Sequence, residues 1–338
     1  MDWLIAAPFI HDARDTWLDL FVPPPHGRFV AVYGGYAHDR SRRATNAAGW
    51  ADYWRHGGAT WRAAQAHGQP CGIVTLFPHL AMVIGLRKRL SRSKVPLVAW
   101  TFNVGILHGG TRRQLARAAL GAVDRFIVHS RAEIASCSEW LGLPRQRFEF
   151  VPLQRFVPDV EIAEDVERPF VLSMGSAHRD YKLLMPVLGE LGYPAVVVAG
   201  AHALQGISVP SNVELRSGLS TQQCNELLQR ARLNVIPIDN AVTASGQVTL
   251  VDAMMFGRPV IVTRGPASDD YVVDREDGWL IEPGDAADLK QALRALWDNA
   301  PAREAMGRAA RVNAVAKCSD EAIGRELGRV LREVEHKR

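Results

Sequence analysis

Continuous apolar segments alternate with segments of helical periodicity along nearly the whole chain. The apolar segments are runs of Val, Ile, Leu and Phe, which is typical of strands buried on both faces of a parallel sheet. Repeated strand–helix alternation predicts an α/β fold built from doubly wound, Rossmann-like domains. The expected strands are Trp3–Pro8, Arg28–Tyr33, Gly72–Phe77, Leu97–Phe102, Arg125–His129, Phe148–Pro152, Phe170–Met174, Ala195–Ala199, Asn212–Arg216, Leu233–Ile236 and Pro259–Thr263.

A length of 338 residues favours two domains. The boundary is expected in a polar, acidic stretch between Pro152 and Pro169. The predicted organisation is a first domain at 1–155, a linker at 156–168, a second domain at 169–317 and a basic amphipathic helix at 318–338. Ligands of such sheets bind at the carboxyl ends of the strands, so the site is expected where the two domains face each other. The expected helices include Arg112–Val123, Ala132–Leu141, Ser220–Ala231, Val248–Phe256 and Ala286–Asn299.

The cysteines and the charge distribution argue against some classes of protein. The four cysteines form no C-x-x-C pair, which argues against a zinc or redox motif and favours a cytoplasmic protein. Residues 1–160 carry 20 Lys and Arg against 11 Asp and Glu, whereas residues 161–338 carry 20 against 25. Only the first half is therefore expected to meet an anionic surface.

A basic stretch follows the apolar segment Leu80–Leu86. Apolar residues followed by cations suit a helix lying on an anionic membrane, and a solvated helix end is the equally weighted alternative. The membrane interpretation predicts a peripheral location on the inner face of a membrane. Its cations are Arg87, Lys88, Arg89, Arg92 and Lys94.

Ser245 and Gly246 form a small-residue loop directly before an expected helix that Gly257 and Pro259 close. Free N–H groups and the positive end of the helix dipole would point at a ligand there, so a diphosphate would fit. An ordinary strand–helix–strand connection explains the same pattern.

Four blocks of the second half resemble the glycosyltransferase group 1 family. VTLVDAMMFGRPVIVT looks like its donor-site block, and FVLSMGSAHRDYKLLMPVL is similar to its strand, glycine loop and basic pair. NVELRSGLSTQQCNELLQRARLNVIPI resembles its base-binding region, and DREDGWLIEPGDAADLKQALRALWDN its N-G-x-L-V-x-P-G-D block. The resemblance covers about residues 169–300 in the family's order. It implies the GT-B fold and an enzyme that uses a nucleotide sugar. It also implies that the helix at 318–338 crosses back onto the first domain.

The resemblance also implies roles for residues of the second half. Asp252 stands where the family has the second of two glutamates, which holds the ribose hydroxyls, and Lys182 matches its phosphate-binding lysine. Ser176 stands in place of the family's arginine, and Arg179 is the candidate to replace it; a solvated helix start is the alternative for Arg179 and Lys182. Ala244 stands where the first glutamate would be. The expected donor-binding residues are Gly175, Ser176, Arg179, Lys182, Ser245, Gly246, Gln247, Thr249 and Asp252.

The first domain is expected to bind the acceptor. Candidates for contacting it follow expected strands: His11 and Asp12, His79, Asn103 and His129. A general base near the acceptor oxygen is usually Asp, Glu or His. Asp12, His79 and His129 are therefore the catalytic candidates, and His11 and Asn103 the candidates for acceptor binding. A structural role is the alternative for His11, His79 and His129.

These patterns predict transfer of a hexose from a nucleotide-diphosphate sugar, with UDP favoured, to a saccharide or lipid-linked acceptor in the synthesis of a surface polysaccharide or glycolipid. No metal or cofactor is expected, because Arg179, Lys182 and the helix N-terminus supply positive charge. A non-catalytic, nucleotide-binding partner subunit is the alternative, motivated by Ala244. The sequence lacks G-x-G-x-x-G, which argues against a dinucleotide oxidoreductase, and it lacks a nucleic-acid reader motif.

Overall fold

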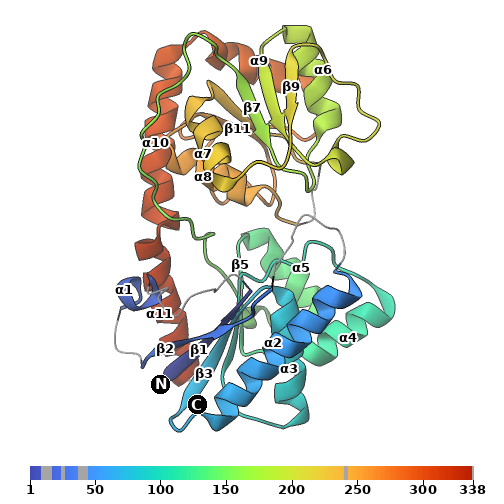
Figure 1. The fold of residues 1–338 in the computed structure, drawn as a ribbon, viewed down its shortest axis with the longest axis vertical. Coiled ribbons are helices and arrows are strands. Elements are labelled where there is room, and N and C mark those ends of the chain that lie inside the picture. The colour runs from blue at the N-terminus through green and yellow to red at the C-terminus, as the bar shows by residue number, and fades with distance from the viewer. Residues whose placement is uncertain (9–16, 24–26, 37–44, 240–242, 337–338) are drawn as a thin grey trace. The chain divides into compact units, whose positions relative to one another are not determined.

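A computed structural model describes residues 1–8, 17–23, 27–36, 45–239 and 243–336. The chain forms two compact units (Figure 1). Unit 1 comprises Met1–Pro152 together with Asp320–Arg338, and unit 2 comprises Leu153–Ser319.

Unit 1 contains a parallel sheet with the strand order β2-β1-β3-β4-β5-β6. Consecutive residues of a strand point to opposite faces, so both faces are apolar and both must be covered. Leu4 and Ile73 pack beneath one set of helices, and Ile5 and Val74 beneath another. The strands are β1 (Asp2–Ala7), β2 (Phe29–Tyr33), β3 (Cys71–Leu76), β4 (Leu97–Trp100), β5 (Arg125–Val128) and β6 (Phe148–Phe150).

The helices α2 (Ala47–Ala66), α3 (Pro78–Leu90), α4 (Gly110–Leu120) and α5 (Arg131–Leu141) cover the first face of this sheet. The second face is covered by α1 (Trp17–Phe21) and α11 (Asp320–His336). Apolar residues of α11 pack on that face, and Trp3 Nε1 donates to Glu335 Oε1 at 2.9 Å. The C-terminal helix therefore completes the core of unit 1.

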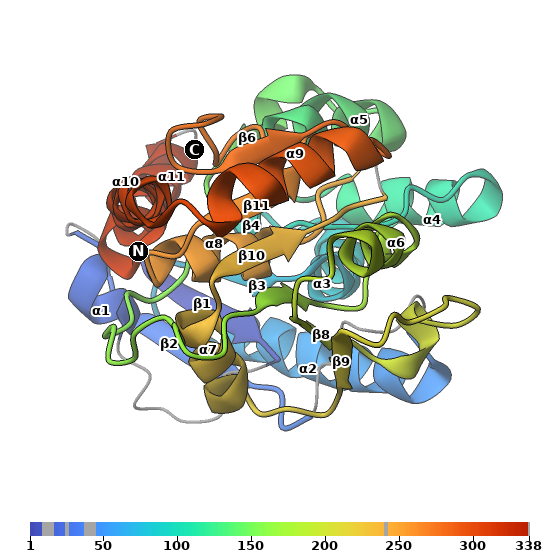
Figure 2. The ribbon, with the colours of Figure 1, turned by 90° about the horizontal axis from the view of Figure 1, so that it is seen from above.

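Unit 2 contains a second parallel sheet with the strand order β12-β11-β10-β7-β8-β9, part of which can be followed in Figure 2. Its strands are β7 (Val171–Met174), β8 (Ala195–Val198), β9 (Val213–Arg216), β10 (Leu233–Ile236), β11 (Val260–Thr263) and β12 (Trp279–Ile281). Its helices are α6 (Tyr181–Leu191), α7 (Thr221–Arg230), α8 (Gln247–Met255), α9 (Ala286–Trp297) and α10 (Ala300–Cys318). Two parallel six-stranded sheets with flanking helices confirm the predicted α/β class.

The stretch 156–168, expected to be a linker, packs on unit 2 instead. Glu164 accepts hydrogen bonds from Arg232 Nε at 2.8 Å and from Arg303 Nη2 at 3.1 Å. Gln229 Oε1 accepts from the main-chain N–H groups of Glu161 and Ile162. Glu164 of this acidic stretch is thus paired with two arginines of unit 2, whereas Asp159, Glu161 and Glu167 are exposed.

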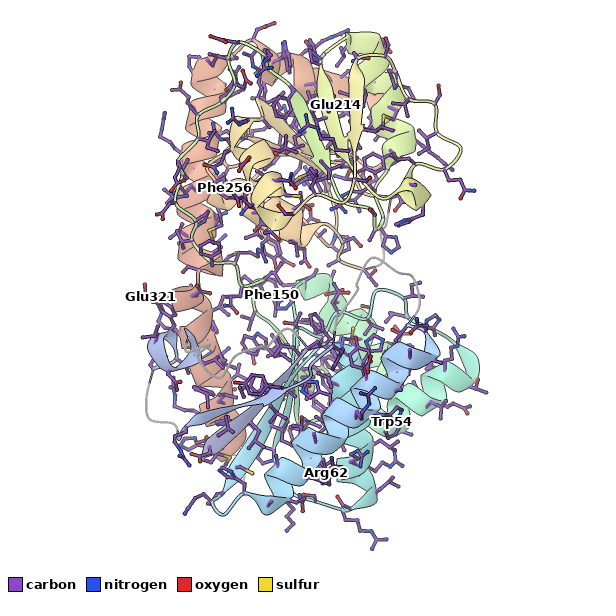
Figure 3. The ribbon with its side chains drawn as sticks, in the orientation of Figure 1. Trp54, Arg62, Phe150, Glu214, Phe256 and Glu321 are labelled. Atoms are coloured by element: carbon purple, nitrogen blue, oxygen red, sulfur yellow. The ribbon has the colours of Figure 1, made fainter. Side chains whose placement is uncertain are left out.

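The prediction that Lys88 faces a membrane is wrong. Its side chain is 7% exposed, and Nζ lies 2.5 Å from Asp124 Oδ2, so it is committed to the interior. Arg87 is half-buried with its guanidinium over the ring of Trp54, which is labelled on α2 in Figure 3. Arg89, Arg92 and Lys94 are exposed. Within the described ranges, no helix combines the length and apolar character needed to cross a bilayer.

Candidate functional site

The start of α8 lies at the carboxyl edge of the sheet in unit 2. Its N-cap is Gly246, whose φ of +83° favours glycine and whose position supplies no capping side chain. A Cβ there would lie 3.0 Å from Ile238 Cδ1. Because the first N–H groups of a helix need partners from outside it, this end suits an anion.

Arg179 ties the loop after β7 to α8. Its Nε donates to the carbonyl of Met174 at 3.0 Å, Nη1 to that of Ala177 at 2.9 Å, and Nη2 to Thr249 Oγ1 at 3.3 Å. A Cβ on Gly175, whose φ is +117°, would lie 2.5 Å from Nη2. Burial lowers the pKa of Arg179. The alternative of a solvated arginine is therefore wrong, and much of its donor capacity is used within the protein.

Lys182 and Ser176 flank the same loop. Lys182 is exposed in the first turn of α6, where its ammonium can reach a ligand in solvent. Ser176 Oγ accepts a hydrogen bond from the N–H of Gly200 at 2.8 Å, which joins the loops that follow β7 and β8. Their phosphate-binding role stays a prediction.

Asp252 forms a bidentate ion pair with Arg155. Arg155 Nε lies 2.5 Å from Oδ1 and Nη2 lies 2.9 Å from Oδ2. Burial raises the pKa of Asp252, and the charge and hydrogen bonds of Arg155 oppose that rise. Sequence reasoning missed Arg155, because the two residues are 97 positions apart and only the fold brings them together.

The remaining predicted donor residues lie along the start of α8. Gln247 is buried and donates from Nε2 to the hydroxyl of Tyr271 at 3.3 Å. Thr249 is engaged by Arg179, as described above. Ser245 is half-buried beside Gly246, and Ala244 is 3% exposed. The structure thus brings Arg179 of the loop 175–182 against Gly246 and Thr249 of the 243–252 segment.

In unit 1, His79 lies in an aromatic group at the start of α3. Its Nε2 is 2.9 Å from Thr45 Oγ1, its ring stacks on Tyr53 with centroids 4.7 Å apart, and Trp50 packs edge-on at 5.0 Å. The preceding residue but one, Phe77, has a φ of +66°, which is strained for a residue with a side chain.

Two other candidates of unit 1 differ in exposure. His129 is 2% exposed and its Nδ1 lies 2.7 Å from the carbonyl of Val151, so it fastens β5 to the segment after β6. Asn103 is half-buried in the loop after β4, next to the strained Thr101 with a φ of +57°. His11 and Asp12 lie outside the described residues.

A tyrosine–histidine pair near β2 escaped the sequence analysis. His56 Nε2 lies 2.9 Å from the carbonyl of Val32, and Nδ1 lies 3.1 Å from Tyr36 Oη. A carbonyl can only accept, so Nε2 carries the proton and Nδ1 accepts from the tyrosine. Burial lowers the pKa of His56, which favours the neutral ring. In the portions of the chain that are described, no three His, Cys, Asp or Glu side chains gather as metal ligands would.

Part of the second unit matches a known family in sequence. Residues 187–299 match the family model of the group 1 glycosyl transferases. The D-rhamnosyltransferase WbpZ of Pseudomonas aeruginosa is 27% identical over 139 residues, which cover 39% of this chain and 36% of that protein. The alignment thus spans little more than a third of this relative.

Solved structures match over nearly the whole chain. Sucrose-phosphate synthase from Thermosynechococcus elongatus has a TM-score of 0.71 and 17% identity, covering 92% of this chain and 84% of its own. HepE of Anabaena, solved in complex with UDP-glucose, has a TM-score of 0.72 and 12% identity, covering 98% and 100%. The chain therefore has the GT-B fold of these structures, and residues 187–299 of its second unit resemble the group 1 glycosyl transferases.

Proposed function

We propose that the protein transfers a hexose from a nucleotide-diphosphate sugar, with UDP favoured, to a saccharide or lipid-linked acceptor in the synthesis of a surface polysaccharide or glycolipid. The observation that carries the proposal is the N-terminus of α8, whose N-cap Gly246 supplies no side chain, with Asp252 further along the same helix. This arrangement offers N–H groups to a diphosphate and a carboxylate to ribose hydroxyls. The rhamnosyltransferase relative and the UDP-glucose complex of HepE support the substrate class.

Each part of the proposed site has a chemical task. The helix N-terminus and the exposed ammonium of Lys182 stabilise negative charge on the departing diphosphate, so the transfer needs no metal. Arg179 holds Gly175 and the start of α8 in place, and its remaining N–H groups can add to that charge. In unit 1, Asp12, His79 and His129 stay the candidates for proton transfer from the acceptor, with His11 and Asn103 as candidates for holding it.

A second candidate function is a nucleotide-binding partner subunit without transferase activity. Two observations favour it. Ala244 offers no carboxylate to a transferred sugar, and the carboxylate of Asp252 is already paired with Arg155. Hydrolysis or transfer of a nucleotide sugar by the purified protein would exclude this candidate.

Thermal shift against UDP, GDP, ADP, CMP, NAD and NADP tests the proposal. A ligand at 100 times its Kd stabilises the fold by about 2.7 kcal/mol, which is a rise of several degrees in Tm. We expect the rise with one nucleoside diphosphate, weaker in Lys182→Ala and retained in Lys317→Ala, an exposed lysine on α10. A rise with NAD or NADP alone, or an equal response of both variants, contradicts the proposal.

We also propose that the protein works in the cytoplasm, peripheral to the inner face of a membrane. The exposed cations Arg89, Arg92 and Lys94 lie beside Leu90, whose side chain is 75% exposed. An exposed apolar residue flanked by cations suits an anionic lipid surface.

A further inference from the structure

The segment that carries Arg155 is fastened at two points. The N–H of Arg155 donates to the carbonyl of Cys318 at 2.8 Å, and the N–H of Leu153 donates to the hydroxyl of Tyr271 at 2.9 Å. That hydroxyl also accepts from Gln247 on α8. The backbone around Arg155 is therefore anchored to the end of α10 and, through Tyr271, is linked to α8, the helix that carries Asp252.

The pair leaves acceptor capacity on Asp252. A carboxylate offers about four lone-pair sites, and Arg155 occupies one on each oxygen. The two side chains remain 33% and 19% exposed for Arg155 and Asp252, so the pair is neither sealed in the core nor fully solvated. Burial raises the pKa of Asp252, whereas Arg155 favours the ionised carboxylate that accepts hydrogen bonds best.

We propose that Arg155 is a positioning residue of the nucleotide site, which holds the Asp252 carboxylate in a single orientation so that its remaining lone pairs accept the ribose hydroxyls. This inference rests on the proposed function. It gives Arg155 a role in recognising the sugar of the nucleotide and none in binding the diphosphate. The two parallel N–H···O bonds of a bidentate guanidinium fix the plane of a carboxylate, which a lysine at the same position cannot do.

Discrimination between ribose and deoxyribose tests the proposal. Isothermal titration calorimetry would compare UDP, GDP, ADP and CDP with their 2′-deoxy forms. The wild type should bind the ribose form of its preferred nucleotide roughly tenfold or more tighter, since a hydrogen bond to a charged group is lost in the deoxy form. Arg155→Gln should lose most of this preference, while its Kd for the deoxy form stays within about threefold of the wild type's.

Three further variants sharpen the result. Asp252→Asn should lose the same preference, and the double variant should lose no more than either single one, because the two residues act as a unit. Arg168→Gln is the matched control, since Arg168 follows the same segment with its side chain 87% exposed. Arg155→Lys keeps a charge beside Asp252, so it tests the positioning role of Arg155 if Arg155→Gln fails to fold. Its preference should fall between those of the wild type and Asp252→Asn.

The outcomes separate this inference from the proposed function. A wild type that binds none of the nucleotides overturns both. A wild type that prefers ribose, with variants that keep that preference, overturns only the role of Arg155. Equal weakening of both nucleotide forms in Arg155→Gln and Arg155→Lys would make Arg155 a merely structural residue. Tighter nucleotide binding in these variants would mean that Arg155 hinders binding, which would also refute its proposed role in positioning Asp252.

Discussion

Replacing Arg179 by lysine should destabilise unit 2 as well as alter ligand binding. The guanidinium bonds two main-chain carbonyls and Thr249 at once, and it lies against Gly175 and Gly246. A lysine ammonium is a point donor that can replace only one of these three bonds. The loop after β7 would therefore lose its connection to α8 even where no ligand is bound.

The magnitude follows from the contacts. Hydrogen bonds from a charged group are worth about 1.5–3 kcal/mol each when their acceptors are left without a partner. The bonds to Met174 and Ala177, at 3.0 and 2.9 Å, have ordinary lengths, and the bond to Thr249, at 3.3 Å, is long and weak. Since lysine restores one bond and water reaches the exposed carbonyl, the net loss should be about 2–3 kcal/mol. For a unit of this size, that corresponds to a fall of about 4–12 °C in Tm.

Differential scanning calorimetry of the full chain, without nucleotide, measures this effect. Lys182→Ala is the control, because an exposed side chain at that position should change the free energy of unfolding by no more than about 0.5 kcal/mol. Should Arg179→Lys melt within about 1 °C of the wild type, the guanidinium would not be holding the loop. Its hydrogen bonds would then be replaceable, and the argument from the three contacts would fail.

Two further predictions concern the cysteines and the basic surface. Iodoacetamide at pH 8 should modify Cys224 alone, since the other cysteines are buried. A second modified cysteine in peptide mass spectrometry would contradict this. Burial raises the pKa of Cys137 and Cys318 from 9.0 to about 12, so the unfolded thiols ionise first and the free energy of unfolding should fall between pH 9 and 12, as urea titrations can measure. In sedimentation with vesicles containing anionic lipid, Arg89→Glu with Arg92→Glu should reduce binding at least several-fold, and unchanged binding would remove the membrane proposal.

Most strands could be predicted from the sequence because they are buried on both faces and read as uninterrupted apolar runs. The strand β12, a short apolar run between Gly278 and Glu282, was not assigned. The helix α10 was not assigned either. Its buried face includes Gly307, Ala310 and Ala314, which are small residues that give a weak apolar period. The need for a small residue is clearest at Gly307, because a Cβ there would lie 2.2 Å from the carbonyl oxygen of Gly257.

Some residues of the candidate site could be predicted from the sequence and others could not. Residues close together in sequence, such as Gly246 and Thr249, could be assigned to one helix end from the pattern alone. The partner of Asp252 could not, since Arg155 lies in a stretch with no motif and reaches Asp252 only through the fold. Lys88 shows the same limit within a run of five cations. Its inward direction depends on Asp124, which is 36 positions away.

The position of α11 has a consequence for synthesis on the ribosome. Unit 1 needs α11 to cover one face of its sheet, yet residues 153–319 are translated between Pro152 and that helix. At about 5–20 residues per second, that interval lasts roughly 8–30 s. During it the side chains of Trp3, Val98 and Ile127 lack their helical cover, while unit 2 has time to fold. The nascent first unit should therefore recruit chaperones, and its folding should finish after that of the unit translated later.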